Sequence, residues 1–177
     1  MPETEDELEL ERRCRAYHEA AHAVVAFWLG RNFSRVSMSC FQTCPPDPIG
    51  VWAQVGEIMM YMAGGLAIRE FVTDAEPHLE GDAVDRKEID RNIQSIAQFM
   101  KEHRDHQLDT EQAIRDIREQ TRQFMKIPEA EKSIEALAKA LHEKGRLNYR
   151  EAVKIMTDAG MEESIAQDLP PRNKWGW

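Results

Sequence analysis

The spacing of apolar residues along the chain predicts a protein built mainly from helices. Apolar positions recur every three to four residues in six segments, the pattern of helices with one buried face. These predicted helices cover about 7–29, 55–72, 83–103, 110–126, 129–144 and 149–160. Gly30 and Gly145 follow two of them in the position typical of a helix end, and Pro128 interrupts the pattern between two others.

A short pair of strands is expected between the first two helices. In "SRVSMSCF", residues 34–41, Val36, Met38 and Cys40 alternate with Ser37 and Ser39, which predicts a half-buried strand. The following "CPPDPIG" predicts a loop, and "VWAQ" is the expected partner strand. The fold class is therefore mainly α with one small strand pair. We expect one domain over 1–162 and a C-terminal tail over 163–177, either mobile or docked elsewhere.

Composition narrows the class of protein further. The net charge of -9 argues against general nucleic-acid binding, which needs a basic surface. The longest apolar run, from Ile58 to Ile68, is shorter than the roughly 20 residues that a membrane-spanning helix needs. The acidic start "MPETEDELEL" does not resemble a secretory signal, and three cysteines favour reduced thiols. We expect a cytoplasmic protein with neither nucleic acid nor membrane as a partner.

The segment "AYHEAAHAVV", residues 16–25, carries the candidate chemistry. His18 and His22 lie four residues apart, so a helix places both imidazoles on one face, where they can bind one metal ion. Glu19 lies about 100° further round the helix, from where it can take a proton from a water on that metal. Both histidines share a stripe with Val25 and Leu29, so they face the core, where unpartnered imidazoles are costly. The alternative is an ordinary core helix with two partly buried histidines.

A catalytic zinc ion usually has three protein ligands, so a third is needed from elsewhere in the chain. Asp85 is the first choice because it heads the apolar stripe that continues through Ile89 and Ile93. Asp82 lies on the same stripe one turn earlier, where a helix N-cap is the better interpretation. Glu70 and Cys14 stay open as weaker alternatives.

Four segments together resemble the peptidase domain of the FtsH-type ATP-dependent zinc metalloproteases. "RRCRAYHEAAHAVVAFWL" resembles the zinc helix of that family, and "IMMYMAGGLAIREFV" resembles its next helix. "GDAVDRKEI" resembles the segment that supplies the third ligand, and "IEALAKALHEKGRLNYREAVKIM" resembles the closing helix pair. The resemblance covers roughly residues 10–157 in the family's order. One departure is Ala21, which stands where the family usually has glycine.

The resemblance implies a helical, zincin-like fold with Zn²⁺ as cofactor. His18, His22 and Asp85 would bind the zinc, and Glu19 would be the catalytic general base. In the family a substrate strand is thought to pair with an edge strand beside the zinc helix, and Arg35, Val36, Ser37, Met38, Ser39 and Cys40 would be that edge here. The family's ATPase module and membrane anchor have no counterpart among these residues.

These expectations lead to one leading function and its competitors. The leading hypothesis is a zinc-dependent endopeptidase that hydrolyses peptide bonds in flexible or unfolded segments without its own ATPase. A variant of it is a narrow regulatory protease that cleaves a single partner. The alternative from another class is a non-catalytic adaptor or regulatory binding module that keeps the metal for stability. The expected partners are a polypeptide substrate and either further copies of the chain or a separate protein.

Overall fold

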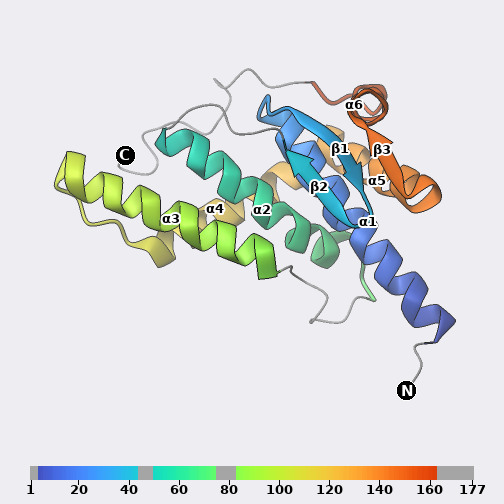
Figure 1. The fold of residues 1–177 in the computed structure, drawn as a ribbon, viewed down its shortest axis with the longest axis horizontal. Coiled ribbons are helices and arrows are strands. Elements are labelled where there is room, and N and C mark those ends of the chain that lie inside the picture. Colours follow the sequence, from blue (N-terminus) through green and yellow to red (C-terminus); the bar gives the residue numbers. More distant parts are fainter. Residues whose placement is uncertain (1–3, 44–49, 75–82, 163–177) are drawn as a thin grey trace.

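The structure is a computed structural model that describes residues 4–43, 50–74 and 83–162, and the described part is mainly helical (Figure 1). Its helices are α1 (Glu5–Trp28), α2 (Val51–Phe71), α3 (Ala83–Arg104), α4 (Thr110–Met125), α5 (Pro128–Lys144) and α6 (Tyr149–Asp158). All six predicted helices are present. Residues 44–49 of the expected loop "CPPDPIG", the tail over 163–177 and Asp82 lie outside the described residues.

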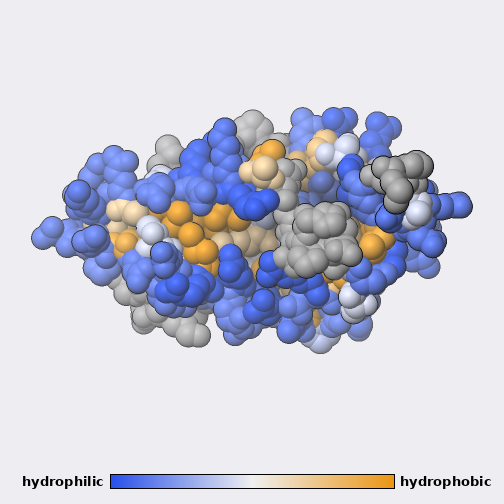
Figure 2. All heavy atoms as spheres, turned by 90° about the horizontal axis from the view of Figure 1, so that it is seen from below, coloured by the Kyte–Doolittle hydropathy of each residue, from blue (hydrophilic) through white to orange (hydrophobic). Residues whose placement is uncertain are grey.

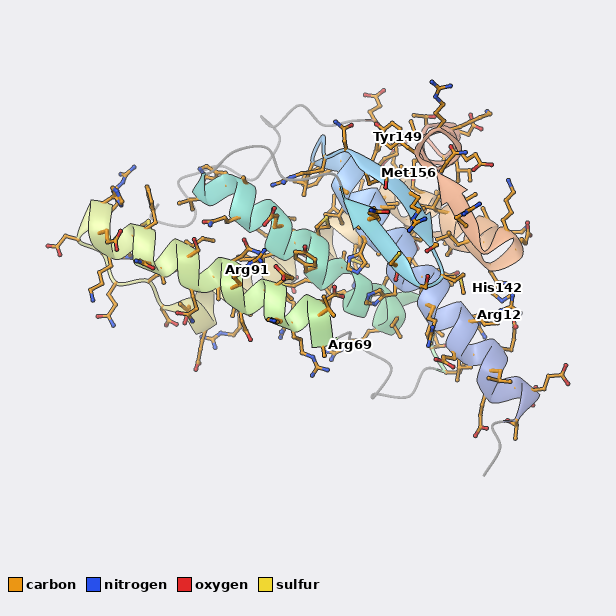
Figure 3. The ribbon with its side chains drawn as sticks, viewed as in Figure 1. Arg12, Arg69, Arg91, His142, Tyr149 and Met156 are labelled. Carbon is orange, nitrogen blue, oxygen red and sulfur yellow. The ribbon has the colours of Figure 1, made fainter. Side chains whose placement is uncertain are left out.

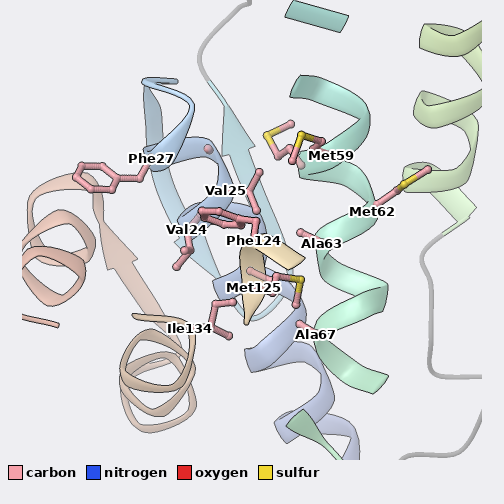
Figure 4. Packing of buried hydrophobic residues seen from close by; sticks show 14 of the residues in the cluster. Val24, Val25, Phe27, Met59, Met62, Ala63, Ala67, Phe124, Met125 and Ile134 are labelled. Atoms are coloured by element: carbon pink, nitrogen blue, oxygen red, sulfur yellow. The ribbon is translucent and has the colours of Figure 1, made fainter. Parts of the chain in front are cut away.

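Helices α1 and α2 form the centre of the fold. α1 packs against α2 on one side and α5 on the other, while α3 and α4 pack against α2. Figure 4 shows Val24 and Val25 of α1 beside Met59 and Ala63 of α2, with Phe124 of α4 between them. The side chains that fill this core are apolar and close to fully buried. The core therefore fixes α1, the helix that carries both histidines, from two sides.

Helix α2 is long and apolar enough to cross a membrane by length and composition alone. Most of its apolar stretch is buried against α1, α3 and α4, as expected for the core helix of a globular protein. The face of the molecule that Figure 2 shows is mostly hydrophilic, with apolar side chains gathered in a strip toward the end that α3 and α4 form.

A three-stranded antiparallel sheet lies beside α1, where the sequence predicted only a strand pair. Its strands are β1 (Phe33–Ser37), β2 (Cys40–Thr43) and β3 (Arg146–Asn148), in the order β2-β1-β3. Val36 of β1 lies opposite Phe41 of β2 and Leu147 of β3. Tyr149 at the start of α6 meets the Phe33 ring edge-on, with the two ring centroids 5.0 Å apart. Helix α6 therefore packs against the sheet next to β3 (Figure 3). The third strand has three residues, too few for an alternating pattern to reveal.

The prediction of one strand over 34–41 with "VWAQ" as its partner is wrong. The chain turns at Met38 and Ser39, and Cys40 starts β2, so the strand pair is a hairpin within the predicted strand. The Ser37 hydroxyl donates to the Cys40 carbonyl at 3.0 Å and accepts from the Cys40 N–H, which holds the turn. "VWAQ" is instead the first turn of α2, in which the Gln54 N–H donates a hydrogen bond to the Gly50 carbonyl.

The prediction that Arg35 to Cys40 form an edge strand is also wrong. β1 is the central strand, because its residues pair with β2 on one side and with β3 on the other. Arg35, Val36 and Ser37 therefore have no free edge, and Cys40 begins the neighbouring strand. Within the described residues the edges of the sheet are β2 and β3.

Gly145 ends α5 in the left-handed conformation that the sequence predicts, with φ of 74°. A side chain there would meet nothing within 4 Å, so an added methyl group changes only the backbone strain. We expect Gly145→Ala to lower the free energy of unfolding by about 1 kcal/mol, measured by urea denaturation. Gly145→Asn should cost less, because Asn tolerates this conformation better than Ala does. Equal stability of Gly145→Ala and the unchanged chain would contradict this interpretation.

Candidate metal centre

Helix α1 brings His18 and His22 together on its buried face. The two residues are one turn apart, and their two Nε2 nitrogens lie 2.9 Å from each other. The His22 side chain is 5% exposed and the His18 side chain 12% exposed. The two nitrogens that could bind a metal ion therefore point at one spot that is largely shielded from water.

Asp85 reaches the same spot from the first turn of α3. Its Oδ2 atom lies 3.0 Å from Nε2 of His18 and 3.3 Å from Nε2 of His22. The side chain is 13% exposed, as its position at the head of an apolar stripe predicts. The structure thus brings together the three residues chosen from the sequence as metal ligands, from two helices far apart in the chain.

The histidines keep the Asp85 carboxyl group ionised. Burial raises the pKa of Asp85, but the close contacts of its carboxylate with His18 and His22 outweigh burial and hold that pKa well below its usual range. A carboxylate is the form that binds a cation, so the group is ready for a metal ion at neutral pH.

The three side chains fit a divalent metal ion. Their donor atoms all lie within 4.8 Å of one another, and the described part of the chain holds no other such group of three. A tetrahedral zinc ion with bonds of about 2.0–2.1 Å needs donor atoms about 3.3 Å apart. The observed separations of 2.9, 3.0 and 3.3 Å need only a small expansion to reach that value. Two imidazoles and one carboxylate could therefore hold a metal ion here, and this donor set suits zinc as well as other divalent ions.

Helix α2 also contacts both histidines of the centre. Nδ1 of His22 lies 2.7 Å from the Met60 carbonyl oxygen. Gly64 lies directly against the ring of His18, where a β-carbon would come within 2.5–2.7 Å of three ring atoms. Sequence reasoning missed both contacts. The only signal was the Gly64-Gly65 pair in an otherwise strongly apolar helix, which indicates a close approach by another part of the chain.

The weaker candidates for a third ligand are engaged elsewhere. Glu70 forms ion pairs with Arg122 of α4 at 3.1 Å and with Lys126, the residue directly after α4, at 3.3 Å. Cys14 is buried in a small apolar cluster with Ile68 and Val72, and burial raises the pKa of its thiol. A neutral thiol in an apolar cluster is a poor metal ligand, so Asp85 is the best third ligand among the described residues.

Glu19 and two aromatic rings surround the centre. Glu19 follows His18 on α1 and is partly buried. Phe41 of the edge strand β2 stacks on the His22 ring with centroids 6.0 Å apart, and Tyr61 of α2 meets the same ring edge-on at 6.4 Å. β2, which supplies Phe41, is thus the edge strand next to the histidines, rather than the segment Arg35 to Cys40.

Comparison with known proteins adds no family assignment. No family model matches the chain, and no curated protein matches it significantly. The candidate function therefore rests on the residues of the centre and on their geometry.

Proposed function

We propose that this protein is a zinc-dependent endopeptidase of the FtsH type, which hydrolyses peptide bonds in flexible or unfolded segments. The observation that carries the proposal is the convergence of His18, His22 and Asp85, with Glu19 next to His18 on the same helix. The segments that resemble the FtsH peptidase domain support it further, because they supply these same residues in the family's order.

The residues of the centre divide the chemistry among them. His18, His22 and Asp85 would hold the zinc ion, which when bound would polarise the peptide carbonyl and make water acidic enough to react at neutral pH. Glu19 takes the proton from the attacking water and then returns it to the leaving amine. The Met60 carbonyl accepts a hydrogen bond from Nδ1 of His22 and holds that imidazole in place.

The substrate in this proposal is an extended segment of polypeptide. The side chains of the centre are only 5–13% exposed. A peptide bond of a substrate can therefore reach them only if the substrate segment around that bond is flexible or unfolded. β2 is the edge strand available beside His22, so an extended segment would add to the sheet there by main-chain hydrogen bonds. We propose no unfolding step and therefore no need for ATP.

Casein, which is largely unfolded, is the substrate that tests the proposal. Zinc-loaded protein should degrade casein to fragments, a chelator should stop the reaction, and added zinc should restore it. Bound zinc without any cleavage would refute the peptidase proposal. It would favour the adaptor alternative, in which the metal only ties α1 to α3.

A further inference from the structure

We propose that helix α2 positions both histidines of the metal centre, through the Met60 carbonyl for His22 and through the absence of a side chain at Gly64 for His18. The inference deepens the proposed function and rests on it in one respect, namely that the centre binds zinc. Met60 and Gly64 are positioning residues, since they act on the histidines and not on a substrate.

The register of the two helices makes this pairing possible. His18 and His22 are four residues apart on α1, and Met60 and Gly64 are four residues apart on α2, so each pair lies on one face of its helix. The helices run in opposite directions, which sets Gly64 against His18 and Met60 against His22. One face of α2 therefore meets both imidazoles.

The Met60 carbonyl determines which nitrogen of His22 carries the proton. A carbonyl oxygen only accepts hydrogen bonds, so the 2.7 Å contact requires the proton to be on Nδ1 of His22. Nε2 of the neutral ring then has a free lone pair, and it is Nε2 that faces His18 and Asp85. The ring is thus prepared in the tautomer that binds a metal ion through Nε2.

Gly64 determines where the His18 ring lies. A β-carbon at this position would come within 2.5 Å of Cε1, 2.6 Å of Nδ1 and 2.7 Å of Nε2, all closer than real β-carbons approach other atoms. The ring is planar and rigid, so it cannot bend away as a flexible side chain would. Any side chain at position 64 must therefore turn or shift His18 and move Nε2 away from its two partners.

Gly64→Ala tests this inference against Gly56→Ala as a matched control. Both glycines lie within α2, so both changes raise helix propensity equally. At Gly56 the new methyl group would meet only the end of the Leu29 side chain, at 3.2 Å and beyond. Helix content measured by circular dichroism on the metal-free proteins establishes that both variants fold.

Zinc affinity, measured by competition with a chelator, is the first readout. We expect Gly64→Ala to weaken zinc binding by about 10- to 100-fold, the usual effect of disturbing groups that orient metal ligands. We expect Gly56→Ala to stay within roughly threefold of the unchanged chain, because its methyl group does not reach a ligand. Equal zinc affinities for the two variants would overturn the role of Gly64.

Histidine ring NMR on the metal-free, unchanged chain is the second readout, and it requires neither zinc nor a variant. Nitrogen chemical shifts should show His22 with its proton on Nδ1; a proton on Nε2 instead would overturn the role of the Met60 carbonyl. If the unchanged chain binds no zinc, the proposed function fails. The positioning role of α2 is then still decided by two sets of ring nitrogen shifts. These are the shifts of His22 in the unchanged chain, and those of His18 compared between Gly64→Ala and Gly56→Ala.

Discussion

Glu19→Gln is expected to abolish casein cleavage while zinc stays bound. Glutamine has nearly the same size and shape as glutamate, but its amide cannot take up a proton from water. General acid–base catalysis contributes about 10²- to 10⁴-fold to a rate, so cleavage should fall by at least about 100-fold. The proposed zinc ligands His18, His22 and Asp85 are unchanged, so zinc content per chain should be unchanged as well. Cleavage rate and zinc content are measured on the same preparation.

Glu11→Gln is the control for this prediction. Glu11 lies on the same helix and forms an exposed ion pair with Arg15, one turn away. Such surface pairs contribute little to stability, so this variant should cleave casein at the normal rate. If Glu19→Gln cleaved as fast as Glu11→Gln, Glu19 would not be the general base. A binding function that survives Glu19→Gln intact, with no cleavage by either form, would instead favour the adaptor alternative.

The second large effect is expected for Asp85→Asn, which should weaken zinc binding by more than about 100-fold. Disturbing a group that only orients a ligand costs about 10- to 100-fold, and this change removes the negative charge of a proposed ligand itself. A ligand that binds only the folded state raises stability, so zinc should raise the melting temperature of the unchanged chain. In Asp85→Asn that rise should be lost at the same zinc concentration.

Asp90→Asn is the matched control for Asp85→Asn. Asp90 lies on the same helix and is exposed. Its replacement by asparagine makes the same change of charge and shape as Asp85→Asn. It should keep both the zinc affinity and the rise in melting temperature. Equal zinc binding by the two variants would show that Asp85 is not a ligand.

The residues of the centre could be predicted from the sequence because they depend on local periodicity. Positions 18 and 22 share a face on any α-helix, and Asp85 belongs to the buried stripe of its own helix. The sequence therefore indicated which three side chains face the interior. It did not show that they meet, since that depends on how α3 packs on α2 and α2 on α1.

The contacts that orient the centre and the pairing of the sheet were beyond sequence reasoning. The Met60 carbonyl is a backbone group, so its effect on His22 leaves no mark on residue type. The turn at Met38 and Ser39 contains no glycine or proline, and the alternation of apolar residues continues through it. β3 joins the sheet from more than 100 residues away, which made β1 the central strand and left β2 as an edge.

Zinc content of protein purified without chelator tests the central claim most directly. Elemental analysis should find one zinc per chain, and equilibrium dialysis of the metal-free chain should give one binding site for added zinc. The three converging donor atoms of His18, His22 and Asp85 predict this stoichiometry. A chain that holds no metal as purified and takes up none in dialysis would contradict the metal centre, and with it the proposed peptidase.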